Sequence, residues 1–119
     1  MGKYAQVLDS LITGIVVLDT KLNIKMINTA SELLMHTSKT KAYGRPFKDL
    51  IIGTDSLIQE LRGAIENRQP FTRRGIELHL PDQQSPTVDF TVNVLENPKG
   101  LLIEIQSLNR LCLLYTSDA

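Results

Sequence analysis

Carboxylate, imidazole and guanidinium groups gather between residues 73 and 89, and their spacing permits two kinds of chemistry. Glu77 and His79 are two positions apart, so they would share one face of a β-strand, and Asp89 could lie on the neighbouring strand. Such a trio could bind a metal ion or act as an acid–base pair. The alternative is a solvated sheet face with charge pairing between strands, which we favour because exposed strands commonly carry such pairs.

Other polar residues also admit both a functional and a structural interpretation. Arg73 and Arg74 could hold an anion, but two basic residues that open an exposed strand usually serve solubility. His36 follows an apolar helical segment, where an imidazole can interact with the terminal carbonyls. Asp19 and Asn28 are better explained by turn and cap hydrogen bonds than by catalysis.

Composition bounds the class of protein. The chain has 119 residues, enough for one domain with a core. Its 13 Lys and Arg balance its 13 Asp and Glu, so no charge excess points to nucleic acid. Aromatic side chains make up 5% of the residues and Trp is absent. This composition argues against a surface on which the bases of a single-stranded nucleic acid could stack. No stretch has the length and apolarity of a signal peptide or a membrane span, and we expect a cytoplasmic protein.

A short hairpin would position the first of these groups. Residues 15–18 form an apolar, mostly β-branched run that predicts a strand. A polar turn beginning at Asp19 leads to a second strand over 24–27. Asn28 or Thr29 can then cap a helix near residues 29–36, and Thr-Ala-Ser-Glu from Thr29 onward fits a reciprocal capping box.

The middle of the chain predicts helices of different lengths. Residues 38–50 mix polar residues with glycine and proline, which favours short helical turns. A longer helix follows, capped by Asp55 or Thr54 and stopped by Pro70. Its buried stripe comprises Leu57, Ile58, Leu61, Ala64 and Ile65.

The last third of the chain predicts three strands. Apolar residues alternate over 76–80 and over 88–94, and residues 101–105 are apolar at nearly every position, as in a central strand. Asn97 to Gly100 has the pattern of a type I turn with proline second. Short turns imply antiparallel pairing, so we predict an α+β fold whose five-stranded antiparallel sheet carries helices on one face. The apolar side of the sheet would comprise Ile76, Leu78, Val88, Phe90, Val92 and Val94.

The start of the chain predicts an amphipathic helix that ends at Gly14. Helices from residues 29–68 can already cover one sheet face, so its apolar stripe needs another surface. Pairing of two such helices would bury the stripe, and closed two-fold dimers are the commonest oligomers. We therefore expect a homodimer whose interface comprises Tyr4, Val7, Leu8, Leu11 and Ile12.

The hairpin and its flanks carry a recognisable series of residues: Leu8-Asp9-Ser10-Leu11, then Gly14-Ile15-Val16-Val17-Leu18-Asp19, Ile24, Asn28 and Ala30, and Leu33-Leu34. This series resembles the opening of a PAS domain. The resemblance covers about residues 5–108 and is greatest to the amino-terminal sensory domain of nitrogen-regulation sensor histidine kinases. The implied boundaries are an amino-terminal helix over 1–12, a PAS domain over 13–108, and a linker that begins within 109–119 and runs into a tail foreign to the domain.

The resemblance also implies a sheet order and a role. The last strand would lie beside the first strand of the hairpin. The domain would regulate the balance of kinase and phosphatase activity in a phosphorelay, with the kinase region of the same protein as its partner. The signal would leave the domain through Ser107, Leu108, Asn109 and Arg110.

No cofactor is expected from the resemblance. PAS domains that bind haem carry a histidine on the long helix, and residues 55–68 contain none. Light sensors with flavin carry a reactive cysteine in an Asn-Cys-Arg motif, and the single cysteine, Cys112, lies in the tail. Two alternatives remain open: a PAS domain of a transcriptional activator, or a small α+β domain that binds a ligand or catalyses a reaction.

Overall fold

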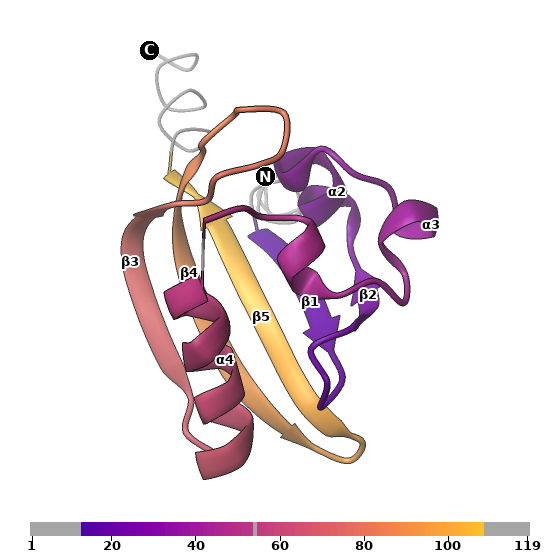
Figure 1. Ribbon diagram of the computed structural model, residues 1–119, viewed down its shortest axis with the longest axis vertical. Coiled ribbons are helices and arrows are strands. Elements are labelled where there is room, and N and C mark those ends of the chain that lie inside the picture. The colour runs from indigo at the N-terminus through magenta and orange to yellow at the C-terminus, as the bar shows by residue number, and fades with distance from the viewer. Residues whose placement is uncertain (1–12, 54, 109–119) are drawn as a thin grey trace, which may run out of the picture.

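A five-stranded antiparallel sheet with helices on one face organises the part of the chain that the structure describes (Figure 1). The structure is a computed structural model that describes residues 13–53 and 55–108. The predicted dimer stripe, Thr54, Asn109 and Arg110 lie outside these residues. In chain order the elements are β1 (Thr13–Leu18), β2 (Ile24–Ile27), α2 (Thr29–Met35), α3 (Lys39–Ala42), the 3-10 helix η1 (Phe47–Asp49), α4 (Asp55–Asn67), β3 (Phe71–Glu77), β4 (Thr87–Glu96) and β5 (Lys99–Ser107).

The strand order β2-β1-β5-β4-β3 places β5 at the centre of the sheet. Both neighbours of β5 run antiparallel to it, with β1 on one side and β4 on the other. The predicted α+β fold is therefore confirmed, as is the expected position of the last strand beside the first. From Leu101 to Ile105 its side chains alternate between buried and half-buried positions, so both faces of β5 are at least partly covered, in keeping with its nearly continuous apolar sequence.

The helical segments lie over one face of the sheet, as predicted (Figure 1). The short turns expected over 38–50 are α3 and η1. The stripe of α4 faces the sheet, with Leu57, Ile58, Leu61 and Ala64 buried. Asp55 is the first residue of α4 rather than its cap. The helix ends at Asn67, before Pro70, because Arg68 adopts a left-handed backbone with φ of 53°.

Alternating apolar residues of β4 and β5 line the core on the side of the sheet. Val88, Phe90 and Val92 are fully buried, as are Leu101, Ile103 and Ile105. From the helical layer Phe47 reaches Phe90, with ring centroids 6.4 Å apart and the planes tilted by 43°. Such tilted aromatic pairs add a favourable electrostatic contribution to the burial of both rings.

Two glycines are required by close approaches between elements. The sequence pattern predicts that Gly14 ends a preceding helix. In the structure Gly14 instead lies inside β1, next to α2. A Cβ placed there would be 2.7 Å from Ser31 Oγ. At Gly100 a Cβ would be 2.2 Å from the backbone oxygen of Leu18. A side chain at either position would displace a neighbouring element.

The last hairpins differ from the prediction in two respects. β3 ends at Glu77, although an alternating strand was expected to continue to residue 80. Leu78 and Leu80 are nevertheless buried, and their backbone N–H groups donate to the oxygens of Pro86 and Gln84 across the loop. The connection of β4 to β5 is not a type I turn with proline second. Residues 97 and 98 alone link the strands, through a cis peptide bond, and residues 99 and 100 belong to β5.

Candidate functional site

Asp19 organises the turn between β1 and β2. Its Oδ1 accepts hydrogen bonds from the backbone N–H groups of Lys21 and Asn23, both at 2.9 Å. Its second oxygen lies 3.8 Å from the Lys25 ammonium group. Leu22, within the turn, has a left-handed backbone with φ of 65° and is buried. The carboxylate thus serves the hairpin geometry.

Asn28 joins the first strand to the first helix. Its Oδ1 accepts from Ile15 N at 2.9 Å and from Ser31 N at 3.0 Å. Its Nδ2 donates to the Thr13 oxygen at 3.1 Å. Ser31 is fully buried, and its hydroxyl donates to the Ile15 oxygen at 2.9 Å. Together these bonds fasten the start of α2 to the start of β1.

The capping box predicted from Thr29 onward is not formed. Asn28 is the N-cap residue, and Thr29 is the first residue of the helix. Glu32, the expected partner in the box, instead accepts a hydrogen bond from the backbone N–H of Lys39 at 2.8 Å. The N-cap lies one residue earlier than the box requires. A capping box needs the N-cap residue and the Glu three residues apart, whereas Asn28 and Glu32 are four apart.

The exit of the domain lies beside its entrance. Thr13 pairs with Gln106 across β1 and β5, and Val88 pairs with Ser107 across β4 and β5. Ser107 is buried, whereas Leu108 is half-buried. Of the four predicted exit residues, the first therefore belongs to the sheet.

A small pocket borders the same end of β5. It has a volume of about 210 Å³ and lies between α2 and the loop over 81–86, with Ser107 in its wall. The imidazole of His36 closes one side through a hydrogen bond from its Nδ1 atom to Asp82 in that loop. No local sequence pattern predicts this pair, because the two residues are 46 positions apart. The predicted contact between the imidazole and the helix carbonyls is absent, since only the backbone N–H of His36 caps the helix, through Glu32 O.

The bond to His36 has an electrostatic consequence for Asp82. It holds the pKa of this carboxyl below its ordinary value of 3.8, and a hydrogen bond from the Gln84 backbone acts in the same direction. Hydrogen bonds to the charged form of a carboxyl favour ionisation. Asp82 therefore accepts the bond from His36 as a carboxylate over a wide pH range.

The acidic and imidazole groups singled out between residues 73 and 89 have separate partners. His79 Nδ1 lies 3.0 Å from the Ser85 hydroxyl. Asp89 accepts a hydrogen bond from Gly75 N at 2.9 Å, at the irregular step in the pairing of β3 with β4. Glu77 pairs through its backbone with Thr87. Within residues 13–53 and 55–108, no three His, Cys, Asp or Glu side chains form a group suited to a metal ion.

Arg73 has a structural partner that periodicity did not reveal. Its guanidinium forms a two-pronged ion pair with Glu60 on α4, with Nε 3.2 Å from Oε1. It also lies over the Phe71 ring, 5.7 Å from the centroid. This arrangement ties α4 to the edge strand, so the anion interpretation no longer applies to Arg73.

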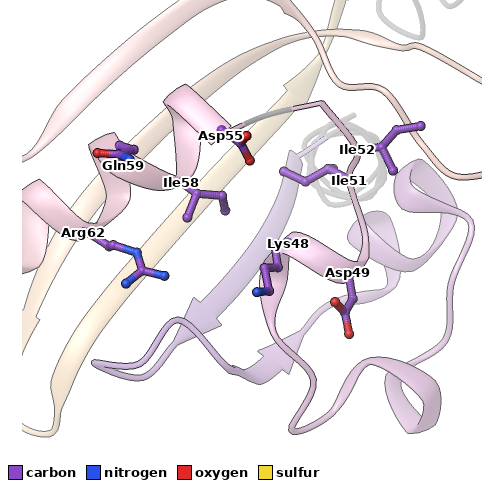
Figure 2. Close-up of a pocket in the computed structure, with 8 residues that line it drawn as sticks. All are labelled: Lys48, Asp49, Ile51, Ile52, Asp55, Ile58, Gln59 and Arg62. Carbon is purple, nitrogen blue, oxygen red and sulfur yellow. The ribbon is translucent and has the colours of Figure 1, made fainter.

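A cleft lies between η1 and α4 (Figure 2). Its volume is about 570 Å³, within the range typical of small-molecule sites. Its wall carries Lys48, Asp49, Ile51, Ile52, Asp55, Ile58, Gln59 and Arg62. None of these residues was predicted as a site.

Comparison with known proteins decides the family. The sequence pattern of the family described as PAS fold matches residues 2–107. The chain belongs to the PAS family. A comparison with curated protein sequences gives no match. None of the helices within residues 13–53 and 55–108 has both the length and the apolarity needed to cross a membrane.

Solved PAS domains share the fold over most of the chain. The PAS domain of nitrogen regulation protein NR(II) from Vibrio parahaemolyticus is 21% identical, with a TM-score of 0.69 and coverage of 88% of this chain and 97% of that one. A PAS domain from Colwellia psychrerythraea is 25% identical, with a TM-score of 0.71 and coverage of 92% and 97%. A domain of a sensory box sensor histidine kinase/response regulator from Geobacter sulfurreducens is 18% identical, with a TM-score of 0.66 and coverage of 87% and 90%. The chain thus shares the PAS fold with domains of signalling proteins, a sensor histidine kinase among them.

Proposed function

We propose that this PAS domain is the sensory and dimerising part of a two-component histidine kinase in nitrogen-responsive control of transcription. The observation that carries the proposal is the pairing of Thr13 with Gln106, which places the entrance and the exit of the domain on adjacent strands. The similarity to the PAS domain of NR(II) supports the nitrogen-regulation context. The kinase region of the same protein would be the downstream partner.

The proposed mechanism runs from the amino-terminal stripe to the last strand. Two copies of residues 4–12 would pair through their apolar side chains and hold the protein as a dimer. Because the chain passes from there into β1, a change in the packing of these helices would move β1 relative to β5. That displacement would reach the chain beyond Ser107 and alter the balance of kinase and phosphatase activity.

The interior of the domain gives little support to an enzyme. Among the described residues, only two polar side chains are buried, those of Ser31 and Ser107. The inward face of the sheet is apolar, and general acid–base catalysis requires titratable groups that converge on a substrate. A PAS domain in a transcriptional activator remains the second candidate, because the same fold serves many signalling proteins.

Phosphotransfer by the protein that carries this domain distinguishes the two candidates. We expect ATP-dependent autophosphorylation of that protein, and we expect Leu8→Asp to change the ratio of phosphorylation to dephosphorylation of its response regulator. Leu33→Asp, at an exposed position of α2, is the matched control and should leave the ratio unchanged. Lack of any autophosphorylation would exclude the kinase and favour the activator.

A further inference from the structure

A groove lies between β2, at one edge of the sheet, and the short helix α3 beside it (Figure 1). Its volume is about 180 Å³, which gives room for one apolar side chain of a partner. Met26 of β2 and Tyr43, which follows α3, line the groove and are 47% and 63% exposed. Ile24 and Ile27 also line it but are buried. The apolar surface that a partner can cover is therefore that of Met26 and Tyr43.

An irregularity of β2 brings two neighbouring side chains to this surface. The pairing steps from Ile24 to Met26 between two consecutive residues of β1, so Lys25 is an extra residue in β2. Successive side chains of a regular strand point to opposite faces, but a bulge of this kind redirects one of them. Both Lys25 and Met26 are exposed here.

The opposite wall of the groove is fixed to the same strand. The backbone N–H of Gly44 donates to Ile24 O at 2.7 Å. The backbone N–H of Tyr43 donates to Lys39 O at 3.0 Å, so these two residues lie one helical turn apart. The ammonium group of Lys25 lies over the Tyr43 ring, 5.7 Å from the centroid. The groove is thus held in shape by contacts within the domain.

The surface around the groove is basic. Residues 19–49 hold six of the chain's 13 Lys and Arg but only three of its 13 Asp and Glu. The three acidic side chains of this segment already accept hydrogen bonds within the domain. Lys39 and Lys41 on α3 are exposed and take part in none of the ion pairs within residues 13–53 and 55–108. A partner that covers the groove would meet this uncompensated positive charge.

We propose that the groove between β2 and α3 binds an acidic segment of a partner protein through one inserted apolar side chain. This side chain would lie between Met26 and Tyr43, and a flanking carboxylate would pair with Lys39. Methionine adapts to irregular shapes, and tyrosine is enriched among the residues that dominate binding energy at interfaces. Such binding does not depend on the kinase proposed above.

Three other occupants fit the groove less well. The net charge of the whole chain is zero, whereas nucleic-acid binding is typical of domains with an excess of basic residues. A membrane surface requires a broad apolar face on an amphipathic helix, and the exposed apolar side chains at the groove are only Met26 and Tyr43. A second copy paired symmetrically would bring like charges together, which is unfavourable.

The test is a titration of the isotope-labelled 119-residue chain with the peptide Glu-Asp-Phe-Asp-Glu, its ends blocked, at low ionic strength. Amide chemical shifts give the binding curve, and we expect saturable shifts at Met26, Lys39 and Tyr43. The same peptide with Ser in place of Phe should bind about tenfold more weakly, because it has no apolar side chain to bury. Shifts that do not saturate, or equal binding of the two peptides, would overturn the proposal.

Variants locate the site. Tyr43→Ala should weaken binding of the Phe peptide by about fivefold or more, since it removes one apolar wall of the groove. Lys39→Gln should weaken it by about threefold, the effect of one exposed ion pair. Lys41→Gln is the matched control, because Lys41 is on the same helix but does not line the groove. Equal losses in Lys39→Gln and Lys41→Gln would show a general charge effect and overturn the site.

Further measurements separate the other occupants. At equal concentration of negative charge, phosphatidylglycerol vesicles and a single-stranded DNA oligonucleotide should bind more weakly than the Phe peptide. Tighter binding of either would identify a membrane or a nucleic acid as the occupant and contradict the proposal. Tyr43→Ala should keep the sedimentation coefficient of the native chain. Dissociation of a dimer by this substitution would show that a second copy covers the groove, which also overturns the proposal.

Discussion

Thr13 and Gln106 lie opposite each other in the antiparallel pairing of β1 with β5. The chain therefore enters the described domain and leaves it on neighbouring strands, at the same end of the sheet (Figure 1). A displacement of the segment before Thr13 has a short path to the segment after Ser107. This relationship underlies the proposal that dimer packing controls the output.

Replacement of Gly100 by Ala should destabilise the domain. The added methyl group would be 2.2 Å from the backbone oxygen of Leu18, so β1 and β5 would have to separate locally. Overpacking of this kind costs about 1–3 kcal/mol. Urea denaturation followed by circular dichroism measures the change, and an unaltered midpoint would show that the strands are farther apart than described.

Replacement of Gly63 by Ala should have the opposite effect. Gly63 lies inside α4, and a methyl group there would meet only Asn67 Nδ2, at 4.0 Å. Ala is favoured over Gly inside helices by about 1 kcal/mol. The same denaturation experiment should give a midpoint above that of the native chain. A lower midpoint would mean that the packing around α4 is tighter than described.

Asn28→Ala should remove the fastening of α2 to β1. The variant loses the helix cap and leaves the N–H of Ile15 without its acceptor. We expect a loss of about 2–3 kcal/mol in the free energy of unfolding, from the cap and the unsatisfied donor together. Asn28→Asp retains the acceptor for both N–H groups but places a carboxylate oxygen opposite the Thr13 oxygen in place of a donor, so it should cost less than Asn28→Ala. Equal losses in the two variants would contradict the assigned bonds.

The acid limb of the stability curve should depend on Asp82. Its pKa is lowered in the folded state, chiefly by the bond to His36. A group with a lowered folded pKa stabilises above its unfolded pKa, about 3.9, and that contribution disappears as the pH falls through the folded pKa. Asp82→Asn should therefore be less stable than the native chain at pH 6, and the difference should shrink below about pH 4.

The partner variant provides the check on this prediction. His36 occupies a left-handed backbone conformation, with φ of 53° and ψ of 48°, which asparagine tolerates. His36→Asn should thus remove the side-chain bond without straining the helix end, and should reduce the same pH-dependent difference. Parallel denaturation midpoints of native chain and Asp82→Asn at every pH from 6 to 2.5 would show that the pair contributes nothing.

The sequence predicted elements well where the signal is periodic. β2 has the predicted bounds, and the alternation over 88–94 identified the buried residues of β4, apart from the half-buried Val94. Burial of one face imposes a period on any helix or strand, so a single sequence is sufficient to detect it. The short helices over 38–50 followed from turn-forming residues for a similar local reason.

Contacts between distant positions could not be predicted in this way. Gly14 was interpreted as a helix end because its real constraint, the close approach of Ser31, exists only after α2 packs on β1. The partners of His36 and Arg73 lie on other elements, 46 and 13 residues away.

The oligomeric state tests the central claim most directly. Sedimentation velocity of the native chain, of Leu8→Asp and of the exposed control Leu33→Asp should give a dimer, a folded monomer and a dimer. Burial of one Leu contributes about 1.5–3 kcal/mol. Replacement of Leu8 in both copies should therefore raise the dissociation constant of the dimer by about 100-fold or more. A native chain that sediments as a monomer at micromolar concentration, and that unfolds when Leu8 is replaced, would contradict the proposed dimer. The stripe would then belong to the core of a single chain.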